Sequence, residues 1–329
     1  MKRLWAIALL LALALSAACE GSEEAPQSAA TASPTTTPPT AEGTSTLEPG
    51  TPVAPVAALP VGKIAFSSRR DGNGEIYLLT ADGEANLTRD PGEDAESDLS
   101  PDGNKIVFSS NRDGVFHIFV MSVDGSDLER LTSEPLGDLS PKWSPDGKQI
   151  AFSRTGSLYV MDSDGANVRQ VTEADGGATA APCKSGSFVG GWSPDGKQLT
   201  FYAASVVASE GQVCIVNVDG SGLTVVVSEP PGYHVEPTWS PDGEWIAFRD
   251  IRDGNHEIYI VRPDGTSVED LSDNPATDLE PDWSPDSQWV VFSSDRSGDL
   301  DLYIMRRDGS DVSRVTSTPG KDSESSWGP

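Results

Sequence analysis

The pentapeptide Trp-Ser-Pro-Asp-Gly occupies residues 143–147 and recurs at residues 192–196 and 239–243. Altered copies lie at Leu99–Gly103 and Trp283–Ser287. Proline at the second position of a four-residue turn, aspartate at the third and glycine at the fourth are typical of a type I turn. Each copy therefore predicts a tight connection between two strands.

Six short apolar strands that end in phenylalanine follow the same repeat. They are residues 63–66, 105–108, 149–152, 198–201, 245–248 and 289–292. Their phenylalanines are 42, 44, 49, 47 and 44 residues apart. A repeat of this length fits four short strands, which we letter a to d, and four strands make one blade of a β-propeller.

Every unit also contains an Asp-Gly pair between apolar stretches, which is a strong hairpin signal. These pairs begin at residues 82, 124, 164, 219, 264 and 308. The first unit has no strand a before residue 63, whereas the chain ends in Ser326-Trp327-Gly328-Pro329, which resembles that strand. We therefore predict an all-β, six-bladed propeller over residues 60–329, with a C-terminal strand that completes the first blade and closes the ring.

The repeats resemble those of the TolB propeller family over about residues 60–329. The similar segments are the Trp-Ser-Pro-Asp-Gly turns, the Arg-Asp-Gly-Asn-x-Glu-Ile-Tyr segments and the Asp-Gly-Ser turns. This resemblance implies a propeller whose face docks partner proteins of the cell envelope. TolB itself carries an α/β domain before its propeller, and this chain has a different N-terminal region.

The N-terminal region indicates export. A basic start precedes an apolar run from Leu4 to Leu15, which is too short to span a membrane. Residues 1–18 are therefore predicted to be a signal peptide. Small residues precede Cys19, which we predict to be the lipidated cysteine of a lipoprotein; cleavage after Ala18 to give a soluble protein is the alternative.

The segment that follows predicts a flexible tether. Residues 19–59 consist largely of Ser, Thr, Pro, Ala and Glu, so they cannot bury enough apolar surface to fold. The net charge of the chain is -28, which disfavours nucleic acids and anionic membrane surfaces as partners. We expect a monomer that is anchored by its lipid on the extracytoplasmic side of the cell envelope.

Acidic residues and one histidine mark the predicted binding face, on which the b-to-c turns and the d-to-a loops lie. They stand five and three residues before the Trp position of strand a: Asp94 and Glu96, Asp138, His234 and Glu236, Asp278 and Glu280, and Asp322 and Glu324. The glutamates 96, 236, 280 and 324 are predicted to ring the channel mouth, where their oxygens suit calcium. A basic side chain, shared protons or the turn chemistry of the repeat are the alternatives.

The fourth unit departs from the repeat on this same face. Its loops at residues 173–191 and 203–211 are lengthened, and insertions on one face of a repeat protein usually mark the binding face. We predict that Phe188, Val206 and Val207 contact a partner. Cys183 and Cys214 are predicted to form a disulfide bond.

The sequence favours binding over catalysis. Its three histidines, at positions 117, 234 and 256, occupy different places in different units, and no Gly-x-Ser-x-Gly motif is present. We therefore predict a non-enzymatic module that binds or scaffolds envelope proteins and requires no cofactor. The alternative is a ligand or polysaccharide sensor with a calcium-type cation at the acidic channel mouth.

Overall fold

The structure is a computed structural model that describes residues 57–172, 183, 187–205, 210–227, 233–251 and 254–329. These residues form 24 strands in six four-stranded antiparallel sheets. Within the same ranges, no helix is long and apolar enough to cross a membrane. The predicted signal peptide, Cys19 and most of the tether lie outside the described residues.

Each sheet is one blade, in which the strands follow one another from the channel outward. Blade 1 contains β24 (Asp322–Gly328), β1 (Lys63–Ser68), β2 (Glu75–Thr80) and β3 (Gly83–Asn86). Blade 2 contains β4 (Asp94–Leu99), β5 (Lys105–Ser110), β6 (His117–Ser122) and β7 (Glu129–Arg130). Blade 3 contains β8 (Asp138–Trp143), β9 (Gln149–Arg154), β10 (Ser157–Asp162) and β11 (Arg169–Gln170).

The remaining blades follow the same order. Blade 4 contains β12 (Ser187–Trp192), β13 (Gln198–Ser205), β14 (Glu210–Asn217) and β15 (Thr224–Val227). Blade 5 contains β16 (Val235–Trp239), β17 (Ile246–Asp250), β18 (Glu257–Val261) and β19 (Glu269–Asp270). Blade 6 contains β20 (Asp278–Trp283), β21 (Trp289–Ser294), β22 (Asp301–Arg306) and β23 (Ser313–Arg314).

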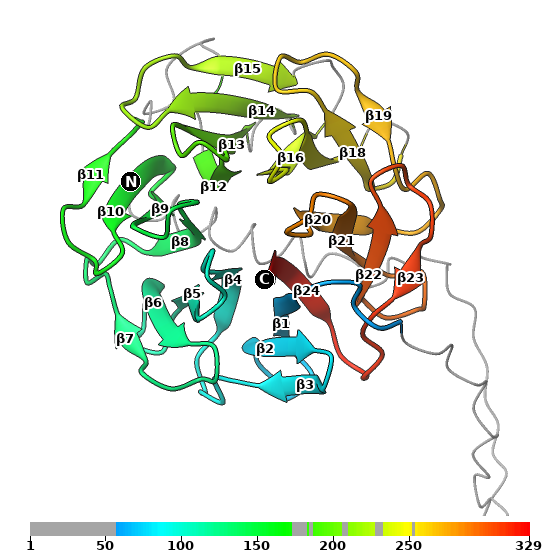
Figure 1. The fold of residues 1–329 in the computed structure, drawn as a ribbon. Coiled ribbons are helices and arrows are strands. Elements are labelled where there is room, and N and C mark those ends of the chain that lie inside the picture. Colours follow the sequence, from blue (N-terminus) through cyan, green and yellow to red (C-terminus); the bar gives the residue numbers. More distant parts are fainter. Residues whose placement is uncertain (1–56, 173–182, 184–186, 206–209, 228–232, 252–253) are drawn as a thin grey trace, which may run out of the picture. The chain divides into compact units, whose positions relative to one another are not determined.

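The six blades form a ring, and the first blade is built from both ends of the described chain (Figure 1). The last strand, β24, pairs antiparallel with β1, with Ile64 opposite Trp327 and Ala65 opposite Ser326. The predicted six-bladed propeller and its closure by the C-terminal strand are therefore confirmed. Closure also removes the open sheet edges that the ring would otherwise present.

The core lies between neighbouring blades. Because side chains alternate across a strand, Ile64 and Phe66 of β1 pack against blade 6, whereas Ala65 packs against blade 2. Both faces of each blade are thus buried, which explains why strands b and c are apolar at nearly every position. The tryptophan that ends strand a, such as Trp327, packs against the preceding blade.

Strand a of each blade contains a β-bulge next to the channel. In β4 the register with β5 shifts between Ala95 and Asp98, and Glu96 has a φ of 54°. The same left-handed conformation recurs at Ser140, Glu236, Glu280 and Glu324, with φ between 52° and 55°. This conformation costs a non-glycine residue about 1–2 kcal/mol, so compensating contacts are needed.

Candidate functional site

The bulge residues of successive blades are joined by a chain of hydrogen bonds. In each step the carboxylate of one glutamate accepts the backbone N–H of the bulge residue in the next blade. The N···O distances are 3.1 Å for Glu236 and Glu280, 2.7 Å for Glu280 and Glu324, 2.9 Å for Glu324 and Glu96, and 2.7 Å for Glu96 and Ser140. We call Glu236, Glu280, Glu324 and Glu96 the glutamate chain.

Serine hydroxyls of strand b add further hydrogen bonds to the glutamate chain. Ser109 Oγ donates to Glu96 at 3.0 Å, Ser293 Oγ to Glu280 at 3.1 Å and Ser67 Oγ to Glu324 at 2.9 Å. Each of these serines directly follows the phenylalanine that ends the apolar repeat. The four carboxylates lie on the innermost strands of their blades, and their oxygens link one blade to the next.

The predicted calcium site is not supported by this geometry. No group of three or more His, Cys, Asp or Glu side chains in the described part of the chain is arranged to hold a metal ion. The carboxylates of the glutamate chain instead accept N–H groups across the blade interfaces. The oxygens thus have a structural role between blades, and calcium binding at the channel mouth stays a prediction.

The aspartates predicted for the binding face are not on the surface. Asp94, Asp138, Asp278 and Asp322 are each fully buried. Each pairs with an arginine: Asp94 with Arg112 at 2.9 Å, Asp138 with Arg154 at 2.5 Å, Asp278 with Arg296 at 2.8 Å and Asp322 with Arg70 at 2.8 Å. Burial raises the pKa of Asp94 and of Asp322. The binding-face prediction was therefore wrong for these four residues.

The arginine partners also stack on aromatic rings of their own blades. Arg112, for example, lies 5.5 Å from the ring centre of Phe108 and 4.9 Å from that of Phe119. Equivalent stacks occur at Arg70, Arg154 and Arg296. A planar, weakly hydrated guanidinium suits such a site, because it can stack and bond a carboxylate at the same time.

Blade 5 has a different buried pair in this place. His234 occupies the aspartate position of strand a, and its Nδ1 lies 3.0 Å from Asp250 Oδ1 on strand b. His234 and Asp250 are buried, and the His234 ring contacts Phe248 edge-on. The binding-face prediction was therefore wrong for His234 as well.

Two large side chains distinguish blades 4 and 5 at the channel mouth. The position held by Ser67, Ser109, Ser153 and Ser293 in the other blades is Tyr202 in blade 4 and Arg249 in blade 5. Arg249 is buried and bonds Glu236 at 2.8 Å, whereas its Nε has no hydrogen-bond partner among the described residues. Sequence reasoning missed both residues, although the break in the serine pattern was a usable signal.

Tyr202 stacks on the predicted contact residue Phe188. The two rings stack with their centres 5.1 Å apart, and both side chains are partly exposed. Burial raises the pKa of Tyr202 well above its usual value, and the charges of Glu236 and Glu96 add to this effect. Phe188 thus stays a candidate contact residue, while Val206 and Val207 lie outside the described residues.

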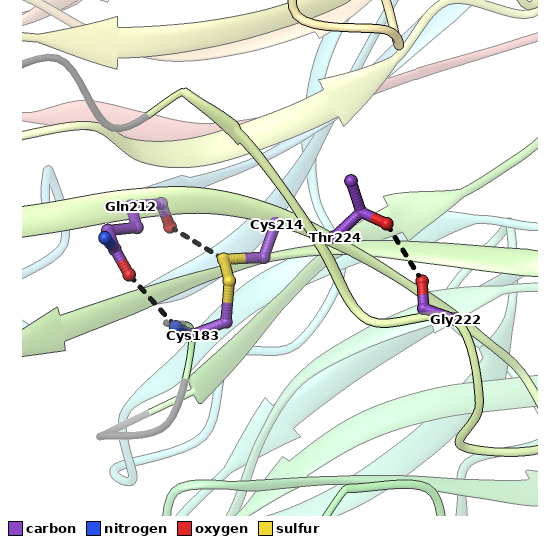
Figure 2. The surroundings of a disulfide bond; sticks show 5 residues. All are labelled: Cys183, Gln212, Cys214, Gly222 and Thr224. Carbon is purple, nitrogen blue, oxygen red and sulfur yellow. Dashed lines mark hydrogen bonds between the residues drawn. A yellow bond between two sulfur atoms is a disulfide. The ribbon is translucent and has the colours of Figure 1, made fainter. Parts of the chain in front are cut away.

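Cys183 and Cys214 form a disulfide bond that fastens the d-to-a loop before blade 4 onto β14 (Figure 2). Their Cα atoms are 6.2 Å apart, and both residues are buried. Gln212 Oε1 also accepts the backbone N–H of Cys183 at 2.9 Å. The bond therefore ties a loop residue to the strand beneath it on the same face as Phe188 and Tyr202.

Replacing both cysteines by alanine is expected to destabilise the folded protein by about 2–4 kcal/mol, because the bond closes a loop between residues 31 apart. Urea unfolding of the oxidised wild type and of the double variant measures this difference. Wild type treated with reductant should match the variant. An equal urea midpoint for oxidised wild type and the variant would contradict the expectation.

A family model described as the TolB beta propeller domain matches residues 41–157 and 153–329. The chain belongs to the TolB β-propeller family. The Tol-Pal system protein TolB of Syntrophus aciditrophicus is 37% identical over 54 residues, which are 16% of this chain and 12% of that protein. The chain thus matches only a small part of this curated TolB sequence.

Solved TolB structures share the fold over most of the chain. TolB from Acinetobacter baumannii has a TM-score of 0.70 and 22% identity, over 82% of this chain and 67% of that one. A structure described as a TolB from Agrobacterium tumefaciens has a TM-score of 0.64 and 25% identity, over 81% and 92%. The similarity to TolB therefore covers the whole ring of blades.

Proposed function

We propose that this chain is a non-enzymatic TolB-like propeller that binds a protein of the cell envelope through the upper face of blades 4 and 5. We define the upper face by the b-to-c turns and d-to-a loops, and the lower face by the Trp-Ser-Pro-Asp-Gly and Asp-Gly turns. In this proposal Cys19 carries a lipid, and residues 19–59 tether a monomeric propeller to the membrane. The family membership supports an envelope role.

One observation supports the location of the binding face. At the channel mouth the repeat changes in two adjacent blades, where Tyr202 and Arg249 replace serine. Tyr202 and Phe188 form a partly exposed aromatic pair, and aromatic residues and arginine supply most of the binding energy at protein interfaces.

Alanine at both Phe188 and Tyr202 is expected to weaken partner binding at least about tenfold, because interface hot spots commonly contribute about 2 kcal/mol or more. Cross-linking of the full chain in intact envelopes, followed by affinity capture, gives the partner, and titration with that partner gives the affinity. The matched control replaces Leu128 and Val168, which are exposed apolar residues of the lower face.

The control variant should retain the cross-linked partner at the wild-type level. Equal loss in both variants would place the interface elsewhere. A partner retained by the Phe188 and Tyr202 variant would refute the proposed face, and the absence of any specific cross-linked protein would refute the proposed function.

A further inference from the structure

The glutamate chain brings several carboxyl groups into one hydrogen-bonded path through blades 5, 6, 1, 2 and 3. These groups interact with one another: Glu280 with Glu236 and Glu324, and Glu96 with Glu324. Like charges held together in a partly buried site repel, so such groups cannot all ionise without a free-energy cost. The arrangement therefore favours a state in which some carboxyls keep a proton.

Few positive charges offset this repulsion. Arg249 bonds Glu236 and also faces Glu280, and its NH1 lies 3.5 Å from His256 Nδ1. Burial, followed by the Arg249 charge, lowers the pKa of His256 to about 4, so this ring adds no positive charge at neutral pH.

One more cation and two tyrosine hydroxyl groups also face the glutamate chain. Lys142 faces Glu96, but its amino group lies 3.3 Å from Asp98 Oδ1 and also faces Asp282. Tyr202 faces Glu236 and Glu96, and Tyr233 faces Glu236. Lys142 is thus shared with Asp98 and Asp282, whereas Arg249 lies beside Glu236 at one end of the glutamate chain. The glutamates at the centre of the glutamate chain therefore lack a full counter-charge.

We propose that the glutamate chain is a proton-sharing unit that couples the closure of the propeller ring to pH. A protonated carboxyl keeps one oxygen to accept the N–H of the next blade and gains an O–H donor. A proton therefore removes the repulsion between neighbouring glutamates without breaking the inter-blade hydrogen bond. This inference is independent of the proposed function.

The direction of the pH effect on folding stability follows from the pKa shifts of Glu96 and Glu280. Burial, and then the charge of Glu324, raises the pKa of Glu96 from 4.5 to about 7. Burial, and then the charges of Glu236 and Glu324, raises the pKa of Glu280 from 4.5 to about 8. Since the folded state holds these protons more tightly than the unfolded state, their stabilising contribution is complete below pH 4.5 and is lost as pH rises through 7 to 8.

The test is urea unfolding of the full chain at several pH values between about 5 and 9, with wild type and Glu280→Gln. Glutamine resembles the protonated carboxyl at every pH. The unfolding constant of wild type should rise as pH rises, about tenfold per pH unit for each extra proton held by the folded state. Glu280→Gln should remove about one such proton, and its stability relative to wild type should increase towards pH 9.

Other buried carboxyls with a raised pKa, such as Asp98 and Asp282, contribute to the pH dependence of stability in both proteins. The test is therefore the difference in pH slope between wild type and Glu280→Gln. The control is Glu244→Gln, at an exposed ion pair of the lower face, which should keep the wild-type slope. An equal pH slope in wild type and Glu280→Gln would overturn the proposal.

A second measurement covers the case in which Glu280→Gln fails to fold. Infrared spectra of folded wild type should show a protonated-carboxyl band at about pH 6.5 that disappears by about pH 9, and Glu96→Gln should reduce this band. A folded wild type without that band at the lower pH, or a band unchanged in Glu96→Gln, would refute proton sharing in the glutamate chain.

Discussion

Deletion of Ser323–Pro329 is expected to abolish the cooperative unfolding transition of the propeller. The deletion removes most of β24, and with it the backbone pairing to β1 that closes the ring. It also removes Trp327, which is buried between blades 6 and 1, and Glu324, which links Glu280 to Glu96. Loss of one buried tryptophan alone costs about 3–5 kcal/mol, and domains have only about 5–15 kcal/mol of stability.

Urea titration followed by circular dichroism measures this effect. Wild type should show one steep transition, whereas the truncated chain should show a broad change or none. Removal of Pro329 alone, which is exposed and follows β24, is the control and should leave the transition in place. The same midpoint and slope in the longer truncation would mean that the ring does not depend on β24.

Replacement of Asp138 by alanine is expected to cost about 3–5 kcal/mol of folding free energy. Its carboxylate bonds Arg154 through two contacts, at 2.5 and 2.9 Å, and the two side chains are 0% and 10% exposed. Removing one partner of a buried ion pair leaves an uncompensated charge, which costs more than the pair itself contributes. Arg154 would remain stacked on Phe152 and Tyr159 but would lose the carboxylate that bonds it.

A double-mutant cycle tests this account. Asp138→Leu combined with Arg154→Met should be more stable than the sum of the two single changes predicts, because no charge is left buried. The control is Asp113→Ala, which breaks an ion pair to Arg130 whose side chains are 48% and 40% exposed, and which should cost less than about 1 kcal/mol. Additive single changes would show that Asp138 and Arg154 are not energetically coupled.

The sequence sufficed for the architecture because the repeat encodes it locally. Turn residues, apolar strands and the Phe-to-Phe spacing placed six blades, and the unpaired strand at residues 323–329 predicted the closure that β24 and β1 make. The number of blades and the closure of the ring both depend on backbone preferences and on the pattern of strands, which can be read directly from the sequence. The role of the acidic residues depends on which groups of the protein they contact, and these contacts become visible only in the packed structure.

A signal for the buried ion pairs was nevertheless present. Asp94, Asp278 and Asp322 each bond the arginine that stands four residues after the phenylalanine of strand b, namely Arg112, Arg296 and Arg70. Blade 5 has histidine at the aspartate position and carries an aspartate, Asp250, on strand b instead. An aspartate and an arginine that recur together at fixed positions of a repeat thus indicate a contact, even in a single sequence.

The role of the glutamate chain could not be predicted in this way. It depends on the left-handed conformation at the bulge residues, which turns a backbone N–H toward the preceding blade. The identity of a glutamate or a serine does not indicate that conformation, because neither residue prefers it. The equal 44-residue spacing of Glu236, Glu280 and Glu324 showed equivalence of position, but not the hydrogen bonds that the equivalence serves.

The pairing of β1 with β24 has a consequence for how the protein is made. Ile64 and its partner Trp327 are separated by almost the whole length of the propeller, so about 13 to 53 seconds pass between their synthesis at about 5–20 residues per second. During that time blade 1 has an open strand edge, which invites association with other chains. Association through this edge therefore competes with ring closure until the last strand emerges, so crowding of nascent chains should lower the yield of folded protein more than crowding of finished ones.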